Sequence, residues 1–168
     1  MNGALCTSEL KVIPRLMFER EDDTHVFGYT ADKADVVRSQ RLIENWPRYR
    51  FRFPLIEKGL TKANCLAMVS SAGISPPEVY AMGLPNANCI PCVKATSPNY
   101  WASIRLHFPK EFARMTELSR RLNVRLTRIK GERRFIDEIP EGWPTRDADV
   151  PACDLLCEQI TEMLEEGR

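Results

Sequence analysis

The chain is organised around the stretch Asn86-Ala87-Asn88-Cys89-Ile90-Pro91-Cys92-Val93-Lys94. Its two cysteines are separated by two residues, one of them a proline, which is typical of a tight turn that aims both sulfurs at one point. Such a turn suits a metal ion or an iron–sulfur cluster better than it suits a packed core. Because the turn supplies only two ligands, any further ligands must come from elsewhere in the chain.

Composition places this chain among soluble globular proteins. It has 168 residues, of which 43% are hydrophobic and 28% charged, so we expect a single domain over 1–168. No apolar run reaches the roughly 18 residues that a membrane span needs, which predicts no membrane association. The N-terminal residues lack the pattern of a signal peptide, so we expect a cytoplasmic protein with reduced cysteines, bound to metal or buried.

The first 60 residues predict part of an α/β sheet. Helices are expected over 7–20 and 31–45, and strands over 25–29 and 50–56, by their apolar spacing and their N-cap residues. This alternation is typical of a parallel, Rossmann-like sheet. Two strands are few for a complete sheet of that class, so the fold is expected to be a partial one.

Residues 61–168 predict a helix-rich region around the cysteine turn. We expect helices over 61–71, 76–83, 97–107 and 110–122, and a hairpin that turns at Lys130-Gly131 between strands 124–129 and 133–136. A final amphipathic helix over 151–166 carries Cys153 and Cys157, four residues apart on one face. The fold class is therefore α/β, with a partial parallel sheet and a cysteine-clasped C-terminal half.

Charge is distributed unevenly, although the net charge is only +1. Residues 119–134 carry six more positive than negative charges, and residues 137–168 carry eight more negative than positive ones. The basic segment predicts a surface for phosphates, nucleic acid or an acidic protein, or the two segments neutralise each other. Phe135 is the only aromatic residue near the basic run, which disfavours base stacking. The candidates for anion or partner binding are Lys94, Arg105, Arg120, Arg121, Arg125, Arg128, Lys130, Arg133 and Arg134.

Several motifs resemble one family. The element Cys6-Thr7-Ser8-Glu9-Leu10-Lys11-Val12-Ile13-Pro14 resembles the Cys-Cys-x-x-Arg-Lys-Val-x-Pro element of adenylyl-sulfate and phosphoadenylyl-sulfate (PAPS) reductases. Asn88–Cys92 resembles their Gly-Cys-x-Pro-Cys element, and Gly28–Asp32 is similar to a segment of the wider adenine-nucleotide α-hydrolase group. Tyr100–Met115 and Arg133–Glu138 resemble a phage and prophage branch of the family. The resemblance spans about residues 3 to 157.

The resemblance implies a four-iron, four-sulfur cluster held by cysteines. Position by position, Cys6, Cys89 and Cys92 match three of the family's ligands, whereas Thr7 stands where the fourth is expected. Cys157 or Cys153 on the last helix is a substitute, and we favour Cys157. Four thiolates also suit zinc, which stays the alternative to the cluster.

The resemblance also implies what is missing. The family's Gly-rich phosphate loop precedes the Cys6 element, and the eight glycines of this sequence are isolated from one another. We therefore expect a catalytically incomplete protein of mobile-element type that binds a protein partner or forms a homodimer. It would act as an inhibitor or regulator, for example of a host defence complex such as CRISPR. The alternatives are a sulfur-metabolism reductase or sulfurtransferase domain with an iron–sulfur cluster, and an inactive fragment.

Overall fold

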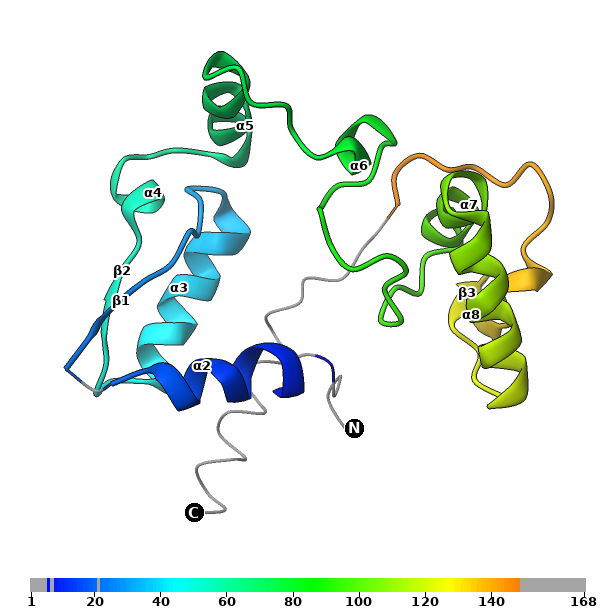
Figure 1. Cartoon of the computed structure of the whole chain (residues 1–168), viewed down its shortest axis with the longest axis horizontal. Coiled ribbons are helices and arrows are strands. Elements are labelled where there is room, and N and C mark those ends of the chain that lie inside the picture. Colours follow the sequence, from blue (N-terminus) through cyan, green and yellow to red (C-terminus); the bar gives the residue numbers. More distant parts are fainter. Residues whose placement is uncertain (1–5, 7, 21, 149–168) are drawn as a thin grey trace. The chain divides into compact units, whose positions relative to one another are not determined.

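The computed structural model describes residues 6, 8–20 and 22–148, and these fall into two compact units that divide between Ser75 and Pro76 (Figure 1). Each unit has a hydrophobic core of its own. The expectation of a single domain over 1–168 stays a prediction, and the helix expected over 151–166 lies outside the described residues. None of the helices in the described part of the chain is long and apolar enough to span a bilayer.

The first unit contains a parallel βαβ motif. Strand β1 (Thr24–Val26) leads through α3 (Lys33–Asn45) to β2 (Arg50–Arg52), and the two strands pair in parallel with His25 opposite Phe51. The other elements of this unit are a π-helix (Ser8–Val12), α2 (Ile13–Phe18), α4 (Pro54–Glu57) and α5 (Lys62–Ser71). The predicted mixed α/β class, with a parallel pair of strands in the first 60 residues, is therefore confirmed.

The two faces of this small sheet differ. On the inner face, His25 and Phe51 join a cluster of aromatic rings that packs on Leu42 and Trp46 of the α3 segment. On the outer face, the side chain of Val26 is 65% exposed. Each strand has only one neighbour, so both edges of the sheet present backbone groups that no other described strand pairs.

Strand β2 is shorter than the sequence predicts. We expected a strand over 50–56, but it ends at Arg52 and a short helix, α4, starts at Pro54. The proline occupies the first helical position, where its fixed φ and missing N–H favour a helix start. The carboxylate of Glu57 accepts a hydrogen bond from the Phe53 N–H (3.2 Å) and closes this turn.

The second unit contains α6 (Glu78–Ala81), α7 (Pro98–His107), α8 (Pro109–Arg121), the strands β3 (Thr127–Ile129) and β4 (Glu132–Arg134), and a 3-10 helix (Ile136–Glu138). Strands β3 and β4 form the expected hairpin, with Lys130 and Gly131 at positive φ (49° and 85°) in its turn. The core of the unit gathers around Trp101 and Ile104 of α7, both fully buried, and it includes Cys92. The cysteine turn is therefore packed directly on α7.

Candidate functional site

The cysteine turn is held by one side chain, that of Tyr100. The backbone N–H of Cys92 donates a hydrogen bond to the phenolic oxygen (2.6 Å), and the phenol in turn donates to the carbonyl of Cys89 (3.4 Å). The N–H of Ala95 donates to the carbonyl of Cys92 (3.1 Å), and the Ile90–Pro91 peptide bond is cis. Tyr100 thus fixes the backbone of both cysteines at once.

The first turn of α7 positions this tyrosine. Ser97 caps the helix by accepting a hydrogen bond from the Tyr100 N–H (3.4 Å), and Pro98 occupies the first helical position. The next residue, Trp101, donates from its indole nitrogen to the carbonyl of Ala95 (2.8 Å). Both ends of the turn are therefore attached to adjacent aromatic side chains of one helix.

The pKa of the Tyr100 phenol is shifted by its surroundings. Burial raises the pKa of Tyr100 to about 12, although the hydrogen bond from the Cys92 N–H acts to lower it. The phenol therefore stays protonated at neutral pH and remains available as a donor to the Cys89 carbonyl.

Two of the four predicted metal ligands, Cys89 and Cys92, lie in the described turn, and the ligand set stays a prediction. Cys89 is exposed and Cys92 is buried in the core of the second unit. Cys6 is exposed in the first unit, and Cys153 and Cys157 lie outside the described residues. Within the part of the chain that the structure describes, no three Cys, His, Asp or Glu side chains form a metal-binding group.

Two buried donors flank this turn without an acceptor. The side-chain nitrogens of Asn88, just before Cys89, and of Lys94, two residues after Cys92, are buried and have no hydrogen-bond partner among the described residues. Burial of a polar group without a partner is costly, and burial of an unpaired charge more so. The sequence identifies Lys94 as a candidate but not Asn88, because only the burial of the amide nitrogen distinguishes Asn88 from other asparagines.

Arg105 has a structural position. Its two terminal nitrogens donate to the carbonyls of Ile139 (2.8 Å) and Pro140 (2.7 Å), and its guanidinium lies 5.7 Å from the centre of the Phe112 ring. These contacts tie the segment after the 3-10 helix to α7. The two nitrogens that would bind an anion already donate to the protein backbone.

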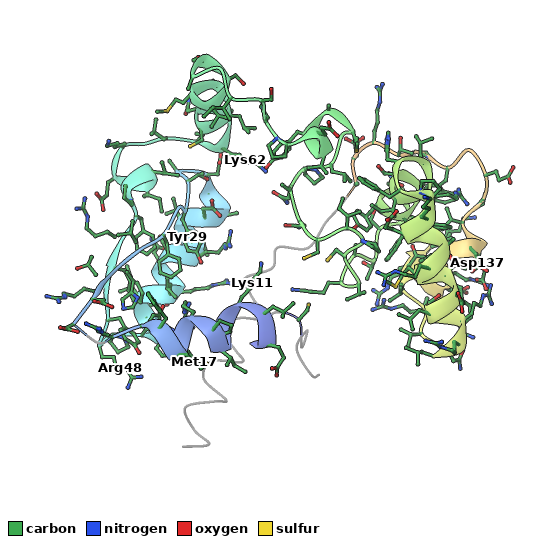
Figure 2. The ribbon with its side chains drawn as sticks, viewed as in Figure 1. Lys11, Met17, Tyr29, Arg48, Lys62 and Asp137 are labelled. Atoms are coloured by element: carbon green, nitrogen blue, oxygen red, sulfur yellow. The ribbon has the colours of Figure 1, made fainter. Side chains whose placement is uncertain are left out.

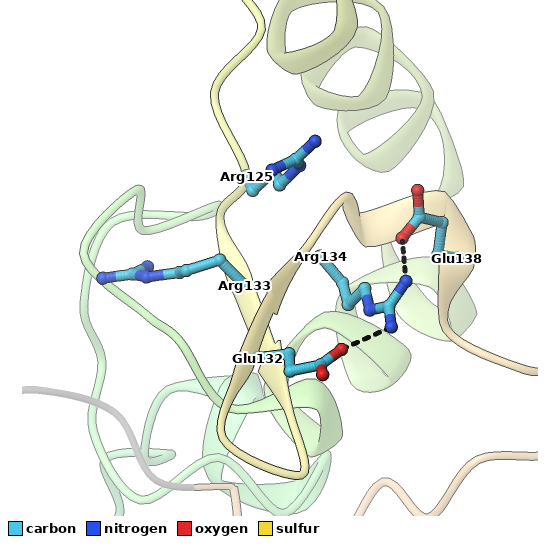
Figure 3. A pocket seen from close by; sticks show the side chains of 5 residues that line it. All are labelled: Arg125, Glu132, Arg133, Arg134 and Glu138. Atoms are coloured by element: carbon cyan, nitrogen blue, oxygen red, sulfur yellow. Dashed lines mark hydrogen bonds and ion pairs between the residues drawn. The ribbon is translucent and has the colours of Figure 1, made fainter.

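Two of the arginines around the hairpin, Arg120 and Arg134, form ion pairs. Arg120 binds Asp137 through two nitrogens (3.1 and 3.0 Å) and lies 3.9 Å from the centre of the Phe135 ring. Arg134 reaches Glu132 (2.5 Å) and Glu138 (4.0 Å), as Figure 3 shows. These ion pairs join the basic segment to the start of the acidic one, so part of the predicted mutual neutralisation occurs within this unit.

A shallow pocket of about 430 Å³ lies beside these pairs. It is lined by Arg125, Glu132, Arg133, Arg134 and Glu138 (Figure 3). Arg133 donates to the carbonyl of Leu126 (3.4 Å), and Arg125 lies 5.4 Å from the Phe135 ring centre. Arg121, Arg128 and Lys130 form no ion pair with the described residues. Phe135 is itself buried, so this surface lacks an open ring on which a base could stack.

The carboxyl ends of the parallel strands in the first unit are lined by acids. After β1, the Asp35 carboxylate accepts hydrogen bonds from the N–H (2.9 Å) and hydroxyl (2.7 Å) of Thr30. Asp32, at the N-cap of α3, accepts from the Lys62 N–H (2.9 Å). After β2, Glu57 binds the Phe53 N–H and pairs with Arg52. Both strand-to-helix junctions are therefore occupied by side chains of the protein itself.

Replacing Asp35 with alanine is expected to destabilise the first unit in a pH-dependent way. Partial burial acts to raise the pKa of Asp35, but hydrogen bonds from Thr30 and the charge of Arg38 outweigh it and hold that pKa below its ordinary 3.8. A carboxyl group whose pKa is lower in the folded than in the unfolded state stabilises the fold at pH values above its unfolded-state pKa. This contribution is lost as the pH falls through the folded-state pKa. We expect a loss of about 1 to 3 kcal/mol at pH 7, which shrinks as the pH falls below about 4.

Urea unfolding of the wild type and of Asp35→Ala across pH 2 to 7 measures this difference. Asp22→Ala is the matched control, because that exposed side chain makes no ion pair with the described residues. A difference between wild type and Asp35→Ala that stays constant over this pH range contradicts the assigned role of the carboxylate.

Comparison of the chain with protein-family models, curated proteins and solved structures finds no match. The resemblance to the PAPS reductases therefore rests on the motifs alone. Any function has to be argued from the cysteine turn, the basic hairpin and the small parallel sheet.

Proposed function

We propose that this chain is a catalytically incomplete, PAPS-reductase-like protein that acts by binding another protein through the sheet of its first unit. In this proposal the β1–α3–β2 motif is part of a Rossmann-like fold, and the partner adds a strand to it. An inhibitor or regulator of a protein complex, such as a host defence complex, fits this description. The carrying observation is a two-stranded parallel sheet whose two edges are paired by no other described strand and whose outer face exposes Val26.

The uncovered sheet favours a partner for a physical reason. Parallel sheets are normally covered on both faces, because their strands are joined by helices that pack against them. Here Val26 is exposed on the outer face, and Met17 and Phe18 on α2 are 83% and 87% exposed (Met17 is labelled in Figure 2). Strand addition uses an unpaired sheet edge, with backbone hydrogen bonds for affinity and side-chain contacts for specificity.

The same unit offers little to a nucleotide. Open α/β sheets bind ligands outside the carboxyl ends of their strands, where helix N-termini attract phosphate. At both such junctions here, carboxylates from Asp32, Asp35 and Glu57 occupy the position and would repel a phosphate. This acidic lining supports a binding protein over an enzyme that cleaves nucleotides at the α-phosphate.

The cysteines support a second part of the proposal, a metal clasp. The resemblance implies that Cys6, Cys89, Cys92 and Cys157 together hold a four-iron, four-sulfur cluster, with zinc as the alternative. Two observations support this part of the proposal: Tyr100 hydrogen-bonds the backbone of both Cys89 and Cys92, and two buried donors beside the turn lack an acceptor among the described residues. A bound cluster would give the chain an electron-accepting group, which is what the competing reductase or sulfurtransferase function requires.

Replacing Val26 with lysine tests the binding surface. A lysine on the exposed face adds charge opposite Arg52, which pairs with position 26, and desolvating that charge opposes strand addition. We expect proteins that the tagged wild type captures from a host lysate to be lost with Val26→Lys, while far-ultraviolet circular dichroism stays unchanged. Val93→Lys is the matched control, because Val93 is also exposed but lies in the second unit.

Three outcomes separate this proposal from its rivals. Proteins lost with Val26→Lys and retained with Val93→Lys locate binding on the sheet of the first unit. Equal capture by the wild type and Val26→Lys places binding elsewhere and contradicts the proposed surface. Loss with an Arg125, Arg128 and Lys130 triple alanine variant would instead favour the basic hairpin as the binding surface.

A further inference from the structure

Two arginines lie directly opposite each other across the β3–β4 hairpin. In its antiparallel register, Arg128 of β3 pairs with Arg133 of β4, so both side chains leave the same face of the hairpin. Glu132 and Arg134 alternate to the other face, and Figure 3 shows the side chain of Arg133 pointing away from both. Like charges directly opposite one another destabilise a pair of strands. An anion that both guanidiniums contact would remove this repulsion.

The described residues do not neutralise these two arginines. Both side chains are exposed, and neither forms an ion pair with a described residue, whereas Arg120 and Arg134 do. Arg133 uses one guanidinium nitrogen in a long hydrogen bond to the carbonyl of Leu126 (3.4 Å). Other exposed cations without an ion pair in the described part of the chain lie between the end of α8 and the hairpin turn: Arg121, Arg125 and Lys130.

The shape and the chemistry of this hairpin favour double-stranded DNA over an acidic protein or a single strand. A two-stranded β-ribbon fits the major groove of B-form DNA, where phosphates follow both sides of the groove. The face that carries Arg128 and Arg133 has no apolar side chain on either strand, whereas the centre of a protein interface is depleted of charge. The ring of Phe135, directly after β4, is buried and therefore not open to stacking by a single-stranded base.

We propose that the β3–β4 hairpin binds the phosphate backbone of double-stranded DNA, with Arg128 and Arg133 as the central phosphate contacts and Lys130 in the turn as a further one. Contacts to phosphate carry no sequence information, so the binding is independent of base sequence. Its affinity comes from several weak contacts made at once, which a mononucleotide cannot supply. The hairpin belongs to the second unit, so this site does not depend on the protein partner proposed for the sheet of the first unit.

Fluorescence anisotropy with the reduced full chain and a labelled DNA duplex of about 20 base pairs measures this binding. We expect a micromolar Kd at about 50 mM salt, which weakens linearly on a double-logarithmic plot as salt is added. Replacing Arg128 and Arg133 together by glutamine is expected to weaken binding at least about 10-fold. It is also expected to lower the slope of the salt dependence by about 2, because two phosphate contacts are lost.

The matched control removes the same charge from another part of the unit. Lys110→Gln with Arg114→Gln changes two exposed cations in the first half of α8, whereas the hairpin follows the other end of that helix. This control is expected to change Kd less than about 3-fold and to leave the salt slope unchanged, because neither residue contacts phosphate in the proposal.

The variant Arg128→Glu tests the opposed pair itself. Glutamate opposite Arg133 replaces a repulsion by an attraction, so we expect Tm to rise by about 1 to 4 °C. The same variant is expected to bind the duplex more than about 10-fold more weakly, because a phosphate contact becomes a repulsion. The opposite signs separate loss of the contact from loss of the hairpin, and they keep the test decisive if the double glutamine variant fails to fold.

Four outcomes overturn the inference. The first is absence of duplex binding by the wild type, and the second is wild-type affinity and salt slope in the double glutamine variant. The third is binding of poly-glutamate as tight as that of the duplex, which would assign the surface to an acidic protein. The fourth is tighter binding of a single strand of the same length, which would exclude the fit of the hairpin to a groove.

Discussion

Replacing Trp101 with alanine is expected to lower the free energy of unfolding of the second unit by about 3 to 5 kcal/mol. This side chain is fully buried among the side chains of the larger core, and its indole lies edge-on to the Tyr100 ring with 5.3 Å between ring centres. The substitution leaves a large cavity and removes the hydrogen bond to the carbonyl of Ala95. A loss of this size is comparable to the total stability of many domains.

The effect reaches the cysteine turn, because Ala95 anchors one end of it. In the Trp101→Ala variant we expect the backbone amides of 84–136 to lose protection against hydrogen exchange, while the amides of 33–45 in the first unit stay protected. Leu106→Ala on the same helix is the control: Leu106 is 64% exposed, so its truncation is expected to cost less than about 0.5 kcal/mol. A loss below about 1 kcal/mol in Trp101→Ala contradicts the assignment of this residue to the centre of the core.

The fold could be predicted where local signals decide it. Thr61 and Asn64 form a reciprocal capping box at the start of α5, and Ser97 with Pro98 starts α7, as their residue types predict. The hairpin turn at Lys130 and Gly131 could also be predicted, because Gly131 readily adopts the positive φ (85°) that the turn requires. The sequence predicts strand β2 to be longer than it is, because the alternating pattern of 50–56 hides the helix start at Pro54.

The candidate site could be predicted only in part, because its decisive contacts join distant residues. The spacing of Cys89 and Cys92 identifies the turn, but nothing in the sequence connects it to the phenol of Tyr100, eight residues after Cys92. Similarly, the basic run gives no sign that Arg120 pairs with Asp137, seventeen residues away. Whether Cys6 and Cys157 complete a metal site with the turn stays a prediction.

The second prediction with a large effect is that the chain does not bind nucleotides. A complete member of the resembled family binds its nucleotide with a Gly-rich phosphate loop, and this sequence has only isolated glycines. The strand-to-helix junctions of the first unit present carboxylates, and the basic groups of the hairpin are partly neutralised by ion pairs. We therefore expect neither ATP nor PAPS to bind the chain in the micromolar range.

The carboxylates make this expectation specific. If Asp35 excludes phosphate from the junction after β1, its replacement by alanine removes one negative charge there and exposes the Thr30 N–H. Asp35→Ala is then expected to bind PAPS no more weakly than the wild type. If Asp35→Ala binds PAPS and the wild type does not, the carboxylate of Asp35 is part of the reason that the wild type fails to bind.

Isothermal titration calorimetry of the full chain with PAPS tests the central claim most directly. The chain should be titrated after reconstitution with iron and sulfide, so that a metal clasp, if it forms, is present. A protein-binding role predicts no heat of binding up to about 1 mM PAPS, which corresponds to a binding free energy weaker than about −4 kcal/mol. Stoichiometric binding with a micromolar Kd would contradict that role and favour the reductase.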